Sequence, residues 1–354
     1  MKTNHNIYSN LAFRLAEINL GKTKKNPSVG CIIVKNDSVI SSGVTSINGR
    51  PHAEFNALKK KISFNKSNMY VTLEPCTHYG KTPPCTYIIK KKKIKNIFYS
   101  FYDPDERTHK KVKKFLKNSA KLKKIDIENK NFYKSYYLNK INKLPLIDAK
   151  IAISKDFFTI NKSSKWITNL RSRRVSHLIR SKYDCIISTS NSINKDNSLL
   201  NCRINGMNHM MPKLIIIDRY LKIKKNLKLF QLTKKRKTTI VTTSNNRNKI
   251  SFLKKKNIKI IKLRKLENKS DFKLLFEKLF ISGSCRILIE SGLVFIVKLF
   301  KFRLINDLYV FKSNTLLKKN GYNNVNTKFL KNLVLKNRIK VNLKNDNLYK
   351  IRFK

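Results

Sequence analysis

One histidine and two cysteines have the types and the spacing of ligands for a catalytic metal ion. His52 opens the sequence His-Ala-Glu, Cys76 follows Glu-Pro, and Cys85 stands eight residues further on, after Thr-Pro-Pro. One imidazole and two thiolates suit zinc, and three protein ligands leave the fourth tetrahedral position for water. The pattern therefore predicts a catalytic zinc site, because a closed structural site would need a fourth protein ligand.

The carboxylate of Glu54, two residues after His52, is the predicted catalytic group. Zinc lowers the pKa of its bound water toward neutrality, so that hydroxide can attack a ring carbon that carries an amino group. Glu54 can take up the proton of this water and deliver it to the ring nitrogen and to the departing ammonia. These residues therefore predict a hydrolytic deaminase.

The elements that must position these residues follow from the periodicity of apolar residues. The predicted helices cover residues 8–18, 52–62 and 84–91, and the predicted strands cover 31–34, 39–40, 69–73 and 97–101. Pro84 at the first helical position would place Cys85 in the first turn, where the helix dipole favours a thiolate. The alternation of strands and helices predicts a layered α/β domain over residues 1–144.

Residues 145–354 begin a new cycle of strands and helices and predict a second α/β domain. Its predicted strands cover residues 146–154, 184–188, 213–218, 238–243, 286–290 and 307–311, and its predicted helices cover 169–181, 271–280 and 292–300. The length of 354 residues also favours two domains. A single hydrophobic core stops growing efficiently beyond about 250–300 residues.

The formal net charge of +59 is high enough to suggest a polyanionic partner such as nucleic acid. The lysines, however, are scattered through nearly every segment, and no recognisable nucleic-acid module accompanies them. The run from Lys234 to Lys237 could mimic a nuclear localisation signal, but such runs are usually solvated loops. We therefore interpret the charge as a drift of composition and expect no specific nucleic-acid partner.

Six cysteines in a chain of this length do not suggest a disulfide scaffold, which favours a reducing, cytoplasmic location. Residues 1–11 lack the continuous apolar region of a signal peptide. The most apolar stretch, residues 287–300, contains Glu290 and Lys298 and is too short and too charged to cross a bilayer. We expect no association with membranes.

Three segments of the first domain carry a resemblance to a known family. They are residues 26–30 (NPSVG), residues 52–54 (HAE) and residues 72–85 (TLEPCTHYGKTPPC). These segments resemble the bifunctional diaminohydroxyphosphoribosylaminopyrimidine deaminase and 5-amino-6-(5-phosphoribosylamino)uracil reductase of riboflavin biosynthesis. Other proteins of the cytidine deaminase fold usually separate the two zinc cysteines by two residues, whereas this family has the longer insert.

The resemblance implies that Asn26, Lys81 and Asp103 hold the phosphorylated pyrimidine substrate, with Lys81 as a partner for its phosphate. Two residues depart from the family pattern. Thr45 stands where the family commonly has His, and Asp105 stands where Asn is common. Both departures concern the contacts with the substrate, and neither touches the predicted zinc ligands.

The resemblance continues through the second domain, in residues 150–156, 164–168, 196–203 and 288–292. It implies a dihydrofolate-reductase-like domain in which NADPH delivers a hydride to the ring-opened ribose carbon. The residues implied to bind the substrate are Ser164, Arg180, Leu200, Arg203 and Glu290. The residues implied to bind NADPH are Ala152, Trp166, Ser192, Asp196 and the stretch from Gly292.

Three departures from the family pattern accompany this second match. Phe157 replaces a usual Gly, Asn197-Ser198 replace Asp-Pro, and Leu293 replaces a small residue or Pro. The sequence also lacks Gly-x-Gly-x-x-Gly, so a Rossmann nucleotide site is not predicted. The resemblance further implies a homo-oligomer built through the reductase domain.

Two other functions are compatible with the zinc pattern. A deaminase of nucleic acid, for example of tRNA, would share the chemistry and use the positive charge. The long spacing between Cys76 and Cys85 and the second domain oppose it. A zinc-stabilised nucleic-acid-binding protein is opposed by Glu54, because a structural site would not need this carboxylate.

Overall fold

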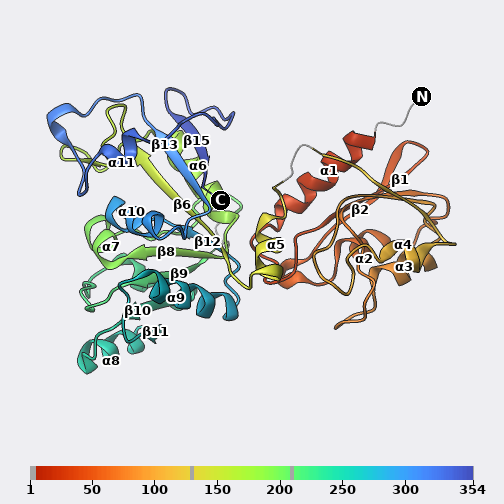
Figure 1. Ribbon diagram of the computed structural model, residues 1–354, viewed down its shortest axis with the longest axis horizontal. Helices are drawn as coiled ribbons and strands as arrows, with labels where there is room; N and C mark the ends of the chain where they lie inside the picture. Colours follow the sequence, from red (N-terminus) through yellow and green to blue (C-terminus); the bar gives the residue numbers. More distant parts are fainter. Residues whose placement is uncertain (1–4, 128–130, 208–210, 354) are drawn as a thin grey trace. The chain divides into compact units, whose positions relative to one another are not determined.

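The computed structural model describes residues 5–127, 131–207 and 211–353, and the chain divides into two compact units (Figure 1). Unit 1 comprises Met1–Leu144 and unit 2 comprises Pro145–Lys354. Each unit has its own sheet and its own hydrophobic core. Each therefore has the layered organisation of an independent domain.

Unit 1 is built on a five-stranded sheet in the order β2-β1-β3-β4-β5. Strand β1 pairs antiparallel with β2 and β3, whereas β3, β4 and β5 run parallel. The strands are β1 (Gly30–Lys35), β2 (Ser38–Val44), β3 (Asn68–Leu73), β4 (Asn96–Phe101) and β5 (Lys121–Lys124). Because β3 and β4 are parallel neighbours, the loops that follow them leave the same edge of the sheet.

Helices pack on the sheet of unit 1. They are α1 (His5–Ile18), α2 (Ala53–Leu58), α3 (Cys85–Lys91), α4 (Val112–Leu116) and α5 (Lys134–Ile141), with a short 3-10 helix η1 (Ile47–Gly49). Helix α2 lies so close to β2 that a Cβ atom at Gly43 would stand 2.3 Å from the carbonyl oxygen of Ala53. Glycine is therefore required at this contact, which sets the position of α2.

The predicted helix over residues 52–62 is wrong at its end. Helix α2 ends at Leu58, and the chain then leaves the helix through three exposed lysines. Six residues beyond the helix, Phe64 is 2% exposed and belongs to the core of unit 1. The chain turns after Leu58 because burial of this large ring outweighs a further helical turn of lysines.

Unit 2 is built on an eight-stranded sheet in the order β11-β10-β9-β8-β12-β6-β13-β15, beside a two-stranded sheet of β7 and β14. Neighbouring strands of the large sheet are parallel, except that β13 and β15 are antiparallel. The strands are β6 (Leu146–Ile153), β7 (Ile160–Asn161), β8 (Cys185–Thr189), β9 (Lys213–Ile217), β10 (Thr238–Thr242), β11 (Ile258–Lys262), β12 (Arg286–Ile289), β13 (Asp307–Lys312), β14 (Gly321–Tyr322) and β15 (Asn347–Arg352).

Helices cover both faces of the large sheet. They are α6 (Leu170–Ser181), α7 (Ser190–Asp196), α8 (Arg247–Lys255), α9 (Lys269–Ile281), α10 (Leu293–Lys301) and α11 (Lys328–Lys331), with 3-10 helices η2 (Lys228–Leu232) and η3 (Lys318–Asn320). Ile187 of β8 packs in one cluster with Phe272 of α9, whereas Ile186 packs in another with Leu253 of α8. Successive side chains of a strand point to opposite faces, so both faces are buried. Within the described residues, no helix has the length and apolar character needed to span a membrane.

Candidate active sites in the two units

The side chains of His52, Cys76 and Cys85 meet beyond the end of β3. Their ligand atoms all lie within 4.8 Å of one another. Nδ1 of His52 stands 3.6 Å from Sγ of Cys76 and 3.4 Å from Sγ of Cys85. His52 directly precedes α2, Cys76 follows β3, and Cys85 begins α3. Three separate segments thus bring one donor atom each to one small space.

The start of α3 holds the two cysteines together. Pro84 has a ψ of 149° and is the N-cap of α3, so the prediction that it occupies the first helical position is wrong. Its extended backbone leaves that position to Cys85, whose N–H donates to Sγ of Cys76 at 3.2 Å. A hydrogen bond with the Cys85 thiol is the largest contribution that lowers the pKa of Cys76, to about 4. Negative charge in the cluster is therefore favoured on Cys76.

Glu54 lies in the first turn of α2 and is 4% exposed. Burial raises its pKa to about 7, and the negative charge of Cys76 acts in the same direction. A hydrogen bond with Cys85 keeps its carboxyl group beside the sulfur atoms. A carboxyl group with a pKa near neutrality can both take up and release a proton, so Glu54 has the setting of a general acid and base.

The three predicted substrate residues of unit 1 lie in different settings. The amide of Asn26 donates to the carbonyl oxygen of Gly49 at 2.8 Å, and Lys81 is exposed in the loop before α3. Asp103 is 6% exposed, burial raises its pKa to about 6, and its Oδ1 accepts from the hydroxyl of Tyr136 at 3.0 Å. Asp103 follows β4, so it lies at the same edge of the sheet as the cysteine that follows β3.

Glu74 holds the loop after β4 against the end of β3, and it is absent from the predicted site. Its Oε2 accepts from the backbone N–H groups of Asp103 at 3.2 Å and Lys110 at 3.0 Å, and its Oε1 accepts from that of Val112 at 3.4 Å. Its position two residues before Cys76, in a motif of the family, is the signal that could have identified it. Glu74 thereby fixes the backbone that carries Asp103.

The two departures from the family pattern in unit 1 have partners inside the unit. Thr45 is 1% exposed, and its hydroxyl oxygen accepts from the N–H of Val29 at 2.9 Å. The carboxylate of Asp105 pairs with Arg107 and with Lys140 of α5, each at 2.7 Å. Hydrogen bonds from Arg107 hold the pKa of Asp105 well below its usual range. Both side chains therefore stabilise the loops on which they stand.

A buried carboxylate with two cationic partners forms the centre of the predicted reductase site. Glu290, directly after β12, pairs with Nε of Arg180 at 2.5 Å and with Nζ of Lys150 at 3.0 Å. A second bond from Nη2 of Arg180, at 3.0 Å, makes the pair bidentate. Burial alone would raise the pKa of Glu290, but the charges of Arg180 and Lys150 hold it well below its usual range. The carboxylate therefore stays ionised.

Arg180 joins this carboxylate to the loop of residues 197–203, which carries Leu200 and Arg203. Nη1 of Arg180 donates to the carbonyl oxygen of Asn201 at 3.0 Å, and Nη1 of Arg203 donates to Oδ1 of Asn201 at 2.8 Å. The structure thus brings Arg180, Leu200, Arg203 and Glu290 together. Two arginines close to one another suit the recognition of a phosphate group.

Ser192 and Gly292, both predicted to bind NADPH, meet beyond the ends of β8 and β12. The N–H of Gly292 donates to Oγ of Ser192 at 2.9 Å, and this Oγ lies 3.2 Å from Oγ of Ser291. Gly292 is the N-cap of α10, so the free N–H groups of this helix begin here. Ala152 lies on β6, the neighbour of β12, and pairs in register with Phe311.

Trp166 and Asp196 are joined through Lys165. Nζ of Lys165 donates to the carbonyl oxygen of Asp196 at 2.8 Å and lies 5.6 Å from the centre of the Trp166 ring. Trp166 is 50% exposed, and the guanidinium group of Arg173 lies 4.2 Å from the ring centre. The exposed Ser164 accepts from the N–H of Trp166 at 3.2 Å. Trp166 is therefore held by its chain neighbour Lys165 and by Arg173 of α6, and Lys165 links it to Asp196.

Phe157, which replaces a usual glycine of the family, has a φ of 66°. This left-handed conformation favours glycine and costs other residues about 1–2 kcal/mol. The ring of Phe157 gains a contact in return, because Nζ of Lys312 lies 4.3 Å from its centre. Leu293, another departure, is 4% exposed and packs in the main core of unit 2. These two departures are thus accommodated within the fold.

Lys150 and His177 contact the predicted reductase residues but are absent from the predicted site. A lysine within the apolar strand β6 is the signal for Lys150, because lysine is almost never fully buried unless it is paired. His177 is 8% exposed, and its Nδ1 lies 3.2 Å from Nη1 of Arg180 and 2.9 Å from the carbonyl oxygen of Asn201. The spacing of three residues on the predicted helix 169–181 could have indicated the contact with Arg180. The contact with Asn201 is set by the packing of α6 against a loop 24 residues away and has no signal in the sequence.

Replacing Arg180 with Met is expected to lower the stability of unit 2 by about 3 kcal/mol, because Glu290 then keeps only Lys150. The pKa of Glu290 is depressed in the folded state. The stability that its ion pair contributes is therefore fully present above the pKa that Glu290 has in the unfolded chain. This stabilisation is lost as the pH falls through the pKa of Glu290 in the folded protein. The decrease in unfolding free energy caused by Arg180→Met should therefore be smaller in acid. Unfolding in urea is measured by the fluorescence of Trp166, the single tryptophan of the chain, which lies in unit 2.

The matched control for this prediction is Arg174→Met, which removes an exposed arginine from the same helix. Its effect should stay within about 0.5 kcal/mol, as is usual for surface positions. Equal stabilities of the two variants would show that Glu290 does not depend on Arg180.

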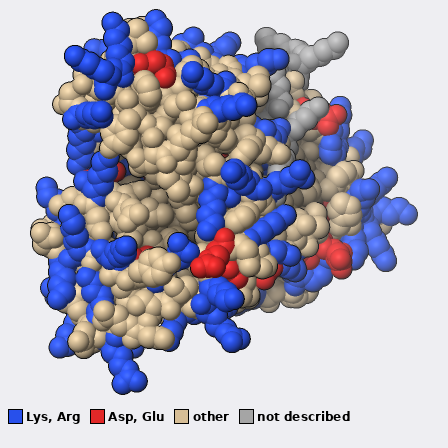
Figure 2. All heavy atoms as spheres, turned by 60° about the vertical axis from the view of Figure 1, so that its left-hand side comes forward, with Lys and Arg blue, Asp and Glu red and all other residues tan. Residues whose placement is uncertain are grey.

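Lysine and arginine side chains are spread over the whole face shown in Figure 2 and do not form one stripe. A nucleic-acid-binding surface usually concentrates its basic residues on one face or along one helix. The distribution on this face therefore agrees with the interpretation of the +59 charge as a property of composition.

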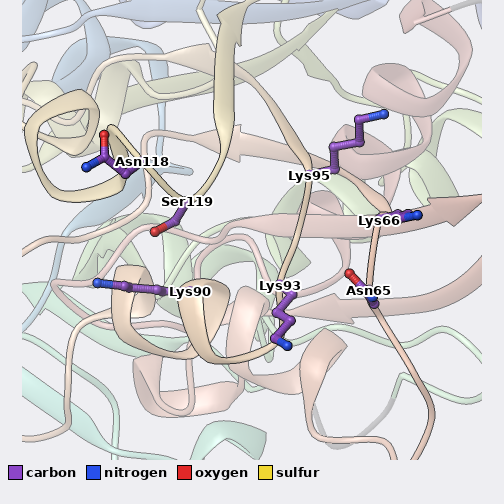
Figure 3. Close-up of a pocket in the computed structure, with 7 residues that line it drawn as sticks. All are labelled: Asn65, Lys66, Lys90, Lys93, Lys95, Asn118 and Ser119. Atoms are coloured by element: carbon purple, nitrogen blue, oxygen red, sulfur yellow. The ribbon is translucent and has the colours of Figure 1, made fainter.

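A cavity of about 520 Å³ in unit 1 lies away from the cysteines. Its lining residues gather before the starts of β3, β4 and β5, at the opposite edge of the sheet from Cys76. In Figure 3 the ammonium group of Lys90 points away from those of Lys66 and Lys95. The lysines therefore do not converge on one ligand, and this cavity is not a candidate active site. The lining residues are Asn65, Lys66, Lys90, Lys93, Lys95, Asn118 and Ser119.

Two family models match the chain. The cytidine and deoxycytidylate deaminase zinc-binding region matches residues 2–101, and the RibD C-terminal domain matches residues 145–327. The second match covers 183 of the 354 residues, more than half of the chain. The matches confirm the predicted fold class, a cytidine-deaminase-like domain followed by a dihydrofolate-reductase-like domain.

Curated relatives resemble the chain in sequence over most of its length. The riboflavin biosynthesis protein RibD of Aquifex aeolicus is 32% identical over 276 residues, which cover 76% of this chain and 77% of that protein. RibD of Actinobacillus pleuropneumoniae is 30% identical over 293 residues, which cover 80% of this chain and 77% of the relative. These matches extend across both units and do not favour either nucleic-acid alternative.

Solved structures show the same fold. Acinetobacter baumannii RibD, form 1, matches with a TM-score of 0.81 at 23% identity, over 98% of each chain. A diaminohydroxyphosphoribosylaminopyrimidine deaminase/5-amino-6-(5-phosphoribosylamino)uracil reductase from Thermotoga maritima matches with the same TM-score, identity and coverage. Together with the geometry of the two sites and the sequence matches, these findings lead to one assignment. The chain belongs to the RibD family of riboflavin biosynthesis proteins and is a bifunctional deaminase and reductase.

Proposed function

We propose that unit 1 deaminates 2,5-diamino-6-(5-phosphoribosylamino)pyrimidin-4-one by zinc-dependent hydrolysis, and that unit 2 then reduces the ribosyl side chain with NADPH. The observation that carries this proposal is the convergence of His52, Cys76 and Cys85 beside the buried carboxyl group of Glu54. The Thermotoga maritima protein is named for both activities, which supports the same pair of reactions here.

The donor atoms of unit 1 fit a zinc ion. One imidazole nitrogen and two sulfur atoms within 4.8 Å of one another form a donor set that zinc prefers, and three protein ligands are the number found in catalytic sites. A zinc ion held by these residues would supply water of lowered pKa at neutral pH. His52, Cys76 and Cys85 are therefore the proposed ligands.

Glu54 is the proposed carrier of protons in the deamination. Its carboxylate would accept a proton from the attacking water while the oxygen bonds to the ring carbon. The protonated carboxyl group would then donate this proton to the ring nitrogen. The regenerated carboxylate would take the remaining proton from the added hydroxyl group and pass it to the amino group, which leaves as ammonia while the carbonyl group forms. Burial supports this role, because it keeps the pKa of Glu54 near 7.

Asn26, Asp103 and Lys81 are proposed to hold the substrate of unit 1. Asn26 and Asp103 offer an amide and a carboxyl group for the polar edge of the pyrimidine, and Lys81 offers a cation for the phosphate. The guanidinium group of Arg50, from another segment, contacts the hydroxyl of Thr82, so a second cation reaches the loop that carries Lys81. Arginine and lysine together suit a phosphate group.

Unit 2 is proposed to bind the deaminated product at Ser164, Arg180, Leu200, Arg203 and Glu290. NADPH, the hydride donor for the ring-opened ribose carbon, would bind at Ala152, Trp166, Ser192, Asp196 and Gly292. The hydroxyl of Ser192 and the N–H groups at the start of α10 suit an anionic part of this cofactor. We further propose a cytoplasmic homo-oligomer, on the strength of the resemblance in sequence.

The test is mass spectrometry of the products after the zinc-loaded protein is incubated with the diaminopyrimidine phosphate and NADPH. Conversion to the deaminated ribityl compound would support both reactions. Accumulation of the deaminated ribosyl compound would contradict the proposed reduction, and an unchanged substrate would contradict the proposal as a whole. In a parallel incubation with RNA we expect no deamination, because the proposed pocket recognises a single phosphorylated pyrimidine.

A further inference from the structure

The basic run of residues 234–237 contains a buried arginine among exposed lysines. Lys234, Lys235 and Lys237 are exposed, whereas Arg236 is 2% exposed. The interpretation of this run as a solvated loop therefore holds for the lysines and is wrong for Arg236. Its guanidinium group is drawn into unit 2 because three backbone carbonyl groups accept its hydrogen bonds there.

The three carbonyl groups belong to two segments that lie far from Arg236 in the sequence. Nε donates to the carbonyl oxygen of Pro212 at 2.6 Å. Nη1 donates to that of Leu199 at 2.5 Å, and Nη2 donates to that of Leu200 at 2.8 Å. Arg236, which precedes β10, therefore ties the loop of residues 197–203 to the segment that precedes β9.

Leu200 has a backbone conformation that needs such support. Its φ is 49°, in the left-handed region that costs a leucine about 1–2 kcal/mol. Strain of this kind persists only where the surrounding structure holds it, and it is concentrated at functional sites. The carbonyl group of the strained residue is one of the three that Arg236 binds.

Two arginines together hold three consecutive carbonyl groups of this loop. Arg236 binds those of Leu199 and Leu200, and Arg180 binds that of Asn201 at 3.0 Å. Arg180 is neutralised by Glu290, whereas no carboxylate pairs with Arg236 in the part of the chain that the structure describes. Burial of a cation without a counter-ion costs free energy, so packing alone does not explain an arginine at this position.

We propose that Arg236 is a positioning residue of the reductase, which holds the loop of residues 197–203 so that Leu200 and Arg203 can meet the substrate. The inference rests on the proposed function, because that function makes the loop part of the substrate site. Arg236 acts through the loop and does not itself touch the substrate. Its guanidinium geometry matters more than its charge, since three carbonyl groups in different directions are bound at once.

The test compares Arg236→Lys with Lys235→Gln in the full-length protein. Lysine keeps the charge but cannot bind three separated carbonyl groups, so the KM for the deaminated ribosyl substrate should rise at least about tenfold. The KM for NADPH and the deamination rate should stay unchanged, which shows that both units are folded. Lys235→Gln removes an exposed charge from the same run and should leave all three values unchanged.

A second measurement reads the loop directly. Hydrogen exchange of the peptide that covers residues 197–203 should be faster in Arg236→Lys than in Lys235→Gln. Equal exchange, or equal KM values for the substrate, would overturn the positioning role. If the unchanged protein reduces no substrate, the proposed function fails and the substrate role of Arg236 fails with it. The exchange rates would then still decide whether Arg236 holds the loop.

Discussion

Glu54→Gln is expected to lower the rate of ammonia release by about 10²–10⁴-fold, because an amide cannot accept the proton of the attacking water. Glutamine has the same size as glutamate, so the buried position in the first turn of α2 should stay filled. The loss should therefore appear in the turnover of the diaminopyrimidine phosphate and not in the folding of unit 1. The measurement is an ammonia assay under saturating substrate.

Two readouts separate a chemical role of Glu54 from a structural one. Zinc content by elemental analysis should equal that of the unchanged protein, because Glu54 is not among the proposed ligands. The reductase should convert deaminated substrate, supplied directly, at an unchanged rate. Loss of zinc from Glu54→Gln would mean that the carboxylate supports the metal site and would contradict its assignment as the proton carrier.

Cys85→Ser is expected to deplete zinc almost completely and to abolish deamination. Cys85 contributes one of the three donor atoms, and its N–H also bonds to Sγ of Cys76 at the start of α3. A serine hydroxyl is a far weaker ligand for zinc than a thiolate, and a site with two remaining protein ligands binds the ion poorly. Elemental analysis after dialysis gives the zinc content, and thermal unfolding should show a lower Tm for unit 1.

Cys31→Ala is the matched control, because Cys31 is a fully buried cysteine of the same unit on β1. Its thiol belongs to the hydrophobic core and not to the group of three ligand residues. This variant should keep its zinc. Full zinc content in Cys85→Ser, or equal depletion in both variants, would refute the assignment of Cys85 as a ligand.

Several helices and strands could not be predicted because lysine hides their periodicity. Helix α8 has Leu253 as its one buried residue, and three of its nine residues are lysines. Strand β11 has lysines at 259 and 262, three positions apart, so its apolar residues do not alternate strictly with polar ones. Such elements form because their few apolar residues complete the core of unit 2, which is a tertiary effect.

The sequence by itself determined the class of reaction and the two folds. The motif residues of unit 1 stand in short continuous segments, and the types of their side chains already limit the chemistry to a zinc-type deaminase. The apolar strands of unit 2 alternate with helices, which predicts an α/β domain, and its central strands pair in parallel. These features depend on residues that are neighbours along the chain.

Only the tertiary structure decided which groups hold the sites in place. Lys150 reaches Glu290 because β6 and β12 are adjacent in the sheet, although 140 residues separate them. Arg236 reaches Leu200 across 36 residues because β9 and β10 pair in parallel. Hydrogen bonds and ion pairs of this kind act over about 3 Å in space, and their partners follow from strand order and loop path. No local pattern of residues specifies that order.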